Sequence, residues 1–182
     1  MIEFDPIIVL ACRYSLALLF AHAAWTKWRA FPYFSATLNE YRLLPPVLVP
    51  SAAAGIVASE AAIAVGALAS PTATFAMALA AILLIVYISA IGINLTRGRN
   101  DIDCGCGGPE SKQTLNGWLV VRNLLLVITA LVGSASLVLR PLTAIDASLI
   151  GLVVLTATVI YLALEQLLSN LPRLDALDEI ME

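Results

Sequence analysis

Two cysteines separated by one glycine are the residues whose types and spacing are best suited to chemistry. Cys104 and Cys106 flank Gly105, and Gly107-Gly108-Pro109 follows them. A disulfide across so few atoms closes a small, strained ring, and strain makes a disulfide more readily reduced. Gly105 permits the backbone angles that such a closure demands. The pair is therefore suited to thiol–disulfide exchange or electron transfer with a partner.

Two other interpretations of the cysteine pair stay open. Zinc or copper could take both thiolates, but four-coordinate zinc needs two more ligands, and only His22 and Asp103 are expected nearby. We therefore predict no metal, and we expect His22 to be a polar anchor at the membrane interface. The last interpretation is two inert thiols, although cysteines in a glycine-rich exposed loop are not packing residues. Cys12 is expected to be a buried apolar filler.

Charged residues inside apolar stretches are the second candidate for function. Arg13 and Glu60 lie at depths of roughly 9 and 14 Å from the same membrane face, so we predict a buried pair between them. Arg122 and Glu165 lie near the opposite face, close to the cysteines. They could form a second pair, but we expect them to reach the headgroups independently.

The composition explains why such charges are exceptional. Of 182 residues, 60% are hydrophobic and only 13% are charged, with a net charge of −3. A soluble domain is nearer 45–50% apolar and about 25% charged. A soluble enzyme and a disordered chain are therefore excluded as the default, and no basic block suggests a nucleic-acid partner.

Five apolar stretches are long enough, or nearly so, to cross a bilayer as helices. The predicted fold is all-α, a polytopic membrane helix bundle with a four-helix core plus one further helix. One transmembrane domain covers residues 1–171, and an acidic tail, favoured as a solvated end, covers 172–182. The predicted helices are Ile7–Ala24, Val47–Ala69, Ala73–Leu95, Trp118–Leu139 and Ala144–Leu167, and the Cys-Gly-Cys loop lies in 96–117.

The positive-inside rule predicts an orientation in a bacterial inner membrane. Five crossings put both long loops and the C-terminal tail on one face, with seven basic residues, and leave only Arg140 outside a helix on the other. The cysteine loop is then cytoplasmic and the N-terminus outside. The first helix is not expected to be a cleavable signal peptide, because Glu3 and Asp5 precede it. The seven are Lys27, Arg29, Arg42, Arg97, Arg99, Lys112 and Arg173.

The order of these elements resembles the methylamine utilisation protein MauE family, which is similar to the wider DoxX-like membrane proteins. The most specific segment is Asp101-Ile102-Asp103-Cys104-Gly105-Cys106-Gly107 ahead of Val121-Arg122-Asn123. One departure is Gly107-Gly108, where an aromatic residue is expected before the second glycine. The other matching pieces are the run from Arg13 to Lys27, Tyr41-Arg42-Leu43-Leu44-Pro45, and Ser59-Glu60.

The resemblance implies a role in processing or maturation of the disulfide-rich small (beta) subunit of methylamine dehydrogenase, with a thioredoxin-like partner. That substrate is exported, whereas the charge count places the cysteines in the cytoplasm. We predict that Cys104 and Cys106 react, supported by Asp103, Gly105, Arg122, Arg13 and Glu60. A quinone-linked membrane oxidoreductase of the DoxX-like type, with a quinone as possible cofactor, and a structural membrane protein with incidental thiols are the alternatives.

Overall fold

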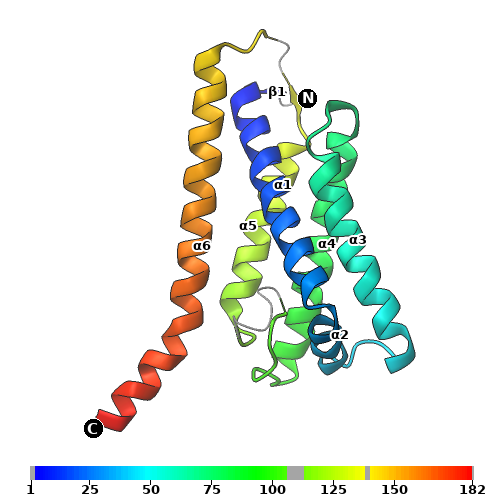
Figure 1. Ribbon diagram of the computed structural model, residues 1–182, viewed down its shortest axis with the longest axis vertical. Coiled ribbons are helices and arrows are strands. Elements are labelled where there is room, and N and C mark those ends of the chain that lie inside the picture. Colours follow the sequence, from blue (N-terminus) through cyan, green and yellow to red (C-terminus); the bar gives the residue numbers. More distant parts are fainter. Residues whose placement is uncertain (1–2, 106–112, 138–139, 182) are drawn as a thin grey trace.

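The computed structural model describes residues 3–105, 113–137 and 140–181, with side chains for 5–105, 113–136 and 140–167. This part of the chain is helical apart from its connections and one short parallel pair of strands, which confirms the predicted all-α class (Figure 1). The elements are β1 (Glu3–Phe4), α1 (Pro6–Arg29), α2 (Phe31–Glu40), the 3-10 helix η1 (Pro46–Leu48), α3 (Val49–Gly66), α4 (Ser70–Thr96), α5 (Gly117–Gly133), β2 (Ser136–Leu137) and α6 (Ala144–Met181).

Four helical segments in the described residues are long and apolar enough to cross a membrane. They are Pro6–Arg29, Pro46–Gly66, Ser70–Thr96 and Ala144–Leu167. The fifth predicted span corresponds to α5, an apolar helix of 17 residues. At 1.5 Å per residue α5 is about 26 Å long, slightly less than the hydrocarbon core. The chain is a multi-pass membrane protein.

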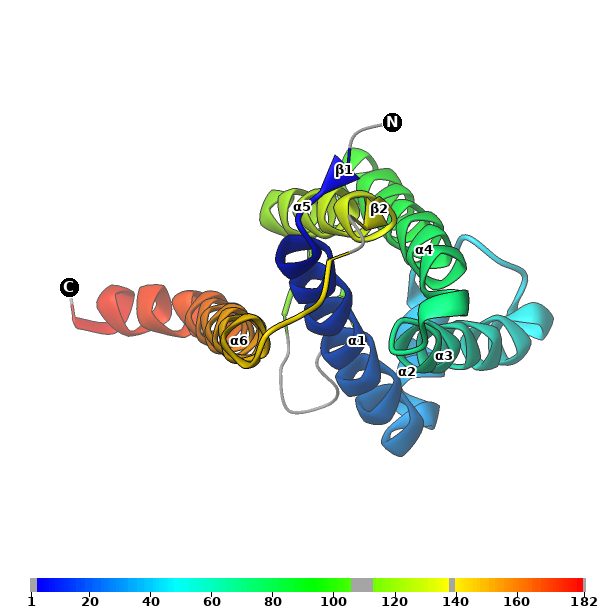
Figure 2. The ribbon, with the colours of Figure 1, turned by 90° about the horizontal axis from the view of Figure 1, so that it is seen from above.

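Helices α1, α3, α4 and α5 pack around a shared core, and α6 stands beside them. The view along the bundle shows α6 outside the group formed by the other four (Figure 2). It packs on α1 through Ala11, Ile150 and Val154. This arrangement is the predicted four-helix core plus one. The core residues of the four helices include Leu16, Phe20, Ile63, Met77, Leu84, Val127 and Ala130.

Helix α5 ends at Gly133, six residues earlier than the predicted Leu139. The chain then forms β2, which pairs in parallel with β1 near the start of the chain. The Gly133 carbonyl accepts a hydrogen bond from the Arg13 side chain at 2.7 Å. Ser136 and Leu137, which the prediction placed in the helix, pair as a strand instead, and the predicted end at Leu139 lies outside the described residues.

The first long loop is also more helical than predicted. Helix α1 continues past Ala24 to Arg29, and α2 occupies Phe31–Glu40 in the segment expected to be a connection. Residues 70–72, which the prediction left between its second and third helices, belong to the first turn of α4, because proline is compatible with a helix N-terminus. These changes move Lys27 into a helix.

The connections separate to the two ends of the bundle. Figure 1 places α2, the described part of the α4–α5 connection and the C-terminal end of α6 at one end. The N-terminus and the α3–α4 and α5–α6 connections lie at the other end. This separation matches the one expected for five crossings. The direction of the bundle across the membrane stays a prediction.

Candidate functional site

Backbone pairing and packing fix Cys104 at the end of the bundle. The Cys104 amide donates to the Gln113 carbonyl at 2.8 Å, and the Leu115 amide donates to the Ile102 carbonyl at 3.0 Å. Cys104 is only 8% exposed. Its position is therefore set by the structure on both sides of the loop. Its apolar neighbours in one cluster are Tyr41, Ile91, Ile102, Leu115 and Leu119.

The Asp103 carboxylate joins the cysteine segment to α2. One of its oxygens accepts a hydrogen bond from the Tyr33 hydroxyl at 3.1 Å, and the other accepts from the Gly105 amide at 2.7 Å. Asp103 thus holds the backbone after Cys104 through Gly105 and ties the segment to α2 through Tyr33. Each carboxylate oxygen of Asp103 has a hydrogen-bond partner, so the role that the structure supports for Asp103 is to position the cysteine segment.

Gly105 occupies a position where a side chain would be costly. Its φ is +71°, in the left-handed region that favours glycine. A Cβ at Gly105 would lie 3.1 Å from Cγ2 of Thr37 and 3.5 Å from Cδ2 of Phe34. The loop therefore passes close to α2. Cys106 lies outside the described residues, so the pairing of the two cysteines stays a prediction.

Two tyrosines border Cys104 and stay protonated over a wide pH range. The Tyr41 hydroxyl donates to the Cys104 carbonyl at 3.3 Å. Burial, followed by the negative charge of Asp103, raises the pKa of Tyr41 well above its ordinary value. Burial and then Asp103 also raise the pKa of Tyr33. Both hydroxyls therefore remain hydrogen-bond donors to the loop.

Glu60 pairs with Lys27, not with Arg13 as predicted. The Lys27 ammonium on α1 donates to Oε1 of Glu60 on α3, and the Tyr87 hydroxyl on α4 donates to the same oxygen at 2.7 Å. Glu60 is 1% exposed and Lys27 is 4% exposed. Oε2 of Glu60 has no hydrogen-bond partner among the described residues. Three helices thus meet at one buried carboxylate.

Arg13 faces a different helix. Its Nε donates to the Gly133 carbonyl at the C-terminal end of α5. That carbonyl lacks an intrahelical donor, and a cation near a helix C-terminus is favourable. The predicted depth of Arg13 put it near Glu60, but depth does not determine which way a helix turns its side chains. Arg13 therefore joins α1 to α5.

Arg122 and Glu165 form the second pair that the sequence allows. Nη1 of Arg122 on α5 lies 2.9 Å from Oε1 of Glu165 on α6. The expectation that the two side chains would reach the headgroups separately is wrong. The Arg122 guanidinium also lies 5.8 Å from the centre of the Tyr161 ring. Its Nε is buried and has no partner in the described part of the chain.

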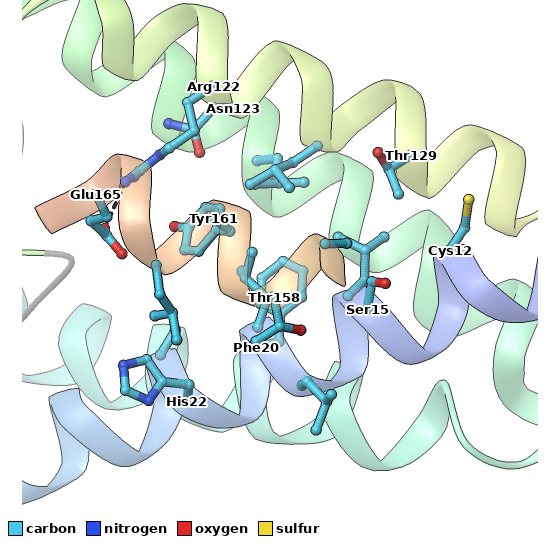
Figure 3. Close-up of a pocket in the computed structure, with 18 of the residues that line it drawn as sticks. Cys12, Ser15, Phe20, His22, Arg122, Asn123, Thr129, Thr158, Tyr161 and Glu165 are labelled. Atoms are coloured by element: carbon cyan, nitrogen blue, oxygen red, sulfur yellow. Dashed lines mark hydrogen bonds and ion pairs between the residues drawn. The ribbon is translucent and has the colours of Figure 1, made fainter. Parts of the chain in front are cut away.

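A cavity of about 530 Å³ connects both charged clusters. Its long walls come from α1 and α6, and α3, α4 and α5 contribute Glu60, Tyr87 and Arg122. Figure 3 shows Arg122, Tyr161 and Glu165 together at one end, with Cys12 and Thr129 toward the other. The cavity is thus polar at one end and mostly apolar along its length.

Phe34 links the polar end of the cavity to the cysteine segment. The Lys27 ammonium, which lines the cavity, lies 5.2 Å from the centre of the Phe34 ring. The Phe34 ring is also one of the two side chains, with Thr37, that a Cβ at Gly105 would approach. A single aromatic ring therefore separates the buried charges from the residue that follows Cys104.

The remaining candidates take other places. His22 is exposed and lines the cavity, and Cys12 is half-buried with its side chain on the same cavity, whereas it was expected to be a buried filler. Among the described residues no group of three or more His, Cys, Asp or Glu side chains could hold a metal ion. His22 and Asp103 do not form such a group.

Lys27 and Tyr87 are the site residues that the sequence analysis missed. A signal for Lys27 exists, because Leu16, Phe20, Ala24 and Lys27 follow one buried stripe at helical spacing. Ending the first predicted helix at Ala24 hid that continuation. Tyr87 carries no comparable signal, since a tyrosine in an apolar helix is also common at lipid interfaces.

Comparisons with known proteins match most of the chain. The family described as Methylamine utilisation protein MauE matches residues 5–136. The Paracoccus denitrificans protein of that name is 41% identical over 127 residues, covering 70% of this chain and 68% of its own length. The Paracoccus versutus and Methylorubrum extorquens proteins are 35% and 36% identical over 133 and 126 residues, covering 73% and 69% of this chain and 71% and 68% of theirs. No solved structure gives a significant match.

Proposed function

Since this chain belongs to the methylamine utilisation protein MauE family, we propose that it is a membrane thiol–disulfide protein acting in methylamine utilisation. Its role is to support maturation of an exported enzyme, the methylamine dehydrogenase small (beta) subunit, together with a thioredoxin-like redox partner. Cys104 and Cys106 are the reacting groups. The sequence match reaches residue 136 and so includes both cysteines and the helices that hold them.

The fixed position of Cys104 is the observation that carries this proposal. Four hydrogen bonds restrain the segment around it, made by α2, by the residue that follows α2 and by the loop itself, through Tyr33, Tyr41, Asp103 and Gln113. A thiol that serves only as filler needs no such set of polar restraints. Restraint of this kind suits a cysteine that must present its sulfur to a partner repeatedly.

The chemistry follows the ordinary course of thiol–disulfide exchange. A thiolate of the reduced pair attacks a partner disulfide, forming one mixed S–S bond and releasing one partner thiolate. The second cysteine then attacks the mixed disulfide, which closes the Cys104–Cys106 bond and releases the other partner thiolate. The partner gains two electrons and the pair loses two. The reverse sequence oxidises a partner dithiol.

Complementation in Paracoccus denitrificans lacking its own MauE protein tests this function. We expect the wild-type chain and Cys12→Ser to restore a fully disulfide-bonded small subunit, measured by mass after alkylation. Cys104→Ser and Cys106→Ser should each fail, with the protein still present in membranes. Restoration by both loop variants would overturn the proposal.

A further inference from the structure

The cavity between α1 and α6 has the shape of a site for a long, apolar molecule. Its α1 wall extends from Ala11 to Lys27, a distance of about 24 Å along the helix. Most of its lining is aliphatic or aromatic, including Leu16, Phe20 and Leu162. A molecule lying here would have its chain parallel to the helices and its head beside the charged clusters.

The charges at the polar end of the cavity determine which kind of ligand head group would bind there. Lys27 is paired with Glu60, and Arg122 with Glu165. The two cations and the two carboxylates sum to zero formal charge. A phosphate would meet no net positive charge there, and the carboxylates would oppose it. A neutral polar head is therefore favoured over a phospholipid headgroup.

Two buried atoms at this end lack partners among the described residues. Nε of Arg122 is a donor and Oε2 of Glu60 is an acceptor. Both residues line the cavity. Leaving buried polar atoms unpaired is costly, so a ligand that accepts from one and donates to the other would be stabilised. A quinone accepts through its carbonyl oxygens, and the corresponding hydroquinone also donates.

We propose that this cavity binds a membrane quinone, with Arg122 Nε donating to one ring oxygen and Glu60 Oε2 accepting from the hydroquinone. The quinone would then be the electron acceptor of the cysteine pair, an assignment that rests on the proposed thiol–disulfide function. Tyr161 and Phe20 face the same space in Figure 3 and provide aromatic surfaces for the ring. Phe34 lies between the charged end and Gly105, which puts the quinone head near the cysteine segment.

The reaction balances without a further reagent. The two S–H bonds of the reduced pair break, one S–S bond forms, and each carbonyl oxygen of the quinone becomes a hydroxyl. Two electrons and two protons pass from the dithiol to the quinone. Reduction of the disulfide by a thioredoxin-like partner or by a substrate dithiol restores the starting state.

Binding of decylubiquinone to the full chain in nanodiscs tests the site directly. We expect saturable binding, measured by competition with an azido-quinone photolabel that attaches to peptides of α1 and α6. Arg122→Gln should weaken binding about tenfold or more, because it removes a charged donor. Arg140→Gln is the matched control, since it removes an arginine from an ion pair at the other end of α6 and should change binding less than twofold.

A second variant keeps the test independent of the buried charges. Ala157→Phe adds a ring to the apolar wall and leaves every polar group of the site in place. It should abolish photolabelling while the protein stays folded. Labelling that survives both Ala157→Phe and Arg122→Gln, or a cavity filled by phospholipid that decylubiquinone does not displace, would overturn the proposal.

The same assay separates this proposal from the proposed function. The double variant Cys104→Ser/Cys106→Ser should bind decylubiquinone as the wild type does, but should not reduce it. If the wild type binds no quinone and the cysteines still support maturation, the quinone site is wrong and the thiol function stands. If quinone binds but the reduced pair leaves it oxidised, the cysteines do not supply its electrons.

Discussion

The Lys27 ammonium lies 5.2 Å from the centre of the Phe34 ring. A buried cation of α1 therefore contacts α2, the helix that packs against the cysteine segment. A cation over an aromatic face is attracted by the ring's quadrupole, and the attraction is larger where water is excluded. The contact joins α1 to α2. The same Phe34 ring lies 3.5 Å from the position that a Cβ on Gly105 would occupy, so it also borders the cysteine segment.

Replacing Phe34 tests whether this contact affects the reduction potential of the two cysteines. Phe34→Leu keeps an apolar side chain but removes the ring that contacts Lys27 and faces Gly105. We expect the reduction potential of the cysteine pair to shift measurably, with little loss of protein from membranes. Phe31→Leu, on the same helix but without the Lys27 contact, is the control. Equal potentials in the two variants would contradict the link.

Gly105 offers a test with a closely matched partner. Gly98 has φ +70° and no described side chain near its Cβ position, whereas Gly105 has φ +71° and Thr37 at 3.1 Å. Both alanine variants carry the cost of a left-handed alanine, about 1–2 kcal/mol. Only Gly105→Ala also displaces the loop from α2. Alkylation of Cys104 should therefore speed up in Gly105→Ala and remain unchanged in Gly98→Ala. The same rate in both would show that the contact with Thr37 is unimportant.

The Lys27–Glu60 pair predicts a non-additive stability pattern. Lys27→Met leaves a buried carboxylate without its cation, and breaking a buried pair costs about 3–5 kcal/mol. The double variant Lys27→Met/Glu60→Leu removes both charges and should be more stable than Lys27→Met alone. Thermal unfolding in detergent measures both. Arg140→Gln, in a partly exposed pair, should lower the midpoint much less, and a double variant less stable than Lys27→Met would contradict the pairing.

Asp5 predicts a pH dependence at the other end of the bundle. The Ile7 amide and then Arg140 hold the pKa of Asp5 below its ordinary value. A lowered carboxyl pKa gives stability that is present above the unfolded value and lost as pH falls through the folded one. Asp5→Asn should therefore lower the thermal midpoint at pH 6, and the difference from wild type should shrink as the pH falls below 3.8, the ordinary pKa of an aspartate. A difference that persists at low pH would contradict this role.

Hydropathy predicted the helices better than their ends. Apolar runs must be helical in a bilayer, because no water is present to satisfy the backbone, so the spans follow from composition. Lys27 shows why the ends did not. The predicted first helix ends at Ala24 and leaves Lys27 in a loop, yet α1 continues and the Lys27 ammonium turns inward to Glu60. The strand pair that stops α5 at Gly133 depends on a contact with the distant N-terminus, which hydropathy does not contain.

The cysteine segment and the charge pairs also show which features the sequence predicts and which depend on the three-dimensional packing. The types and spacing of Cys104, Gly105 and Asp103 predict the loop as the candidate site, and the structure adds hydrogen bonds that position these residues, while their reactivity stays a prediction. Depth along a helix placed Arg13 and Glu60 at similar levels, but the rotation of each helix sends Arg13 to α5 and Glu60 to Lys27. Arg122 and Glu165 lie at similar depths, and the rotations of α5 and α6 also turn the two side chains toward each other, so this pair forms.

Differential alkylation of Cys104 and Cys106 in native membranes, over a series of glutathione redox buffers, tests the central claim most directly. A redox-active pair predicts that both thiols disappear together at one potential and return together on reduction, with Cys12 alkylated to the same extent throughout. Independent alkylation of Cys104 and Cys106 at every potential, with no species linking them, would contradict a thiol–disulfide function.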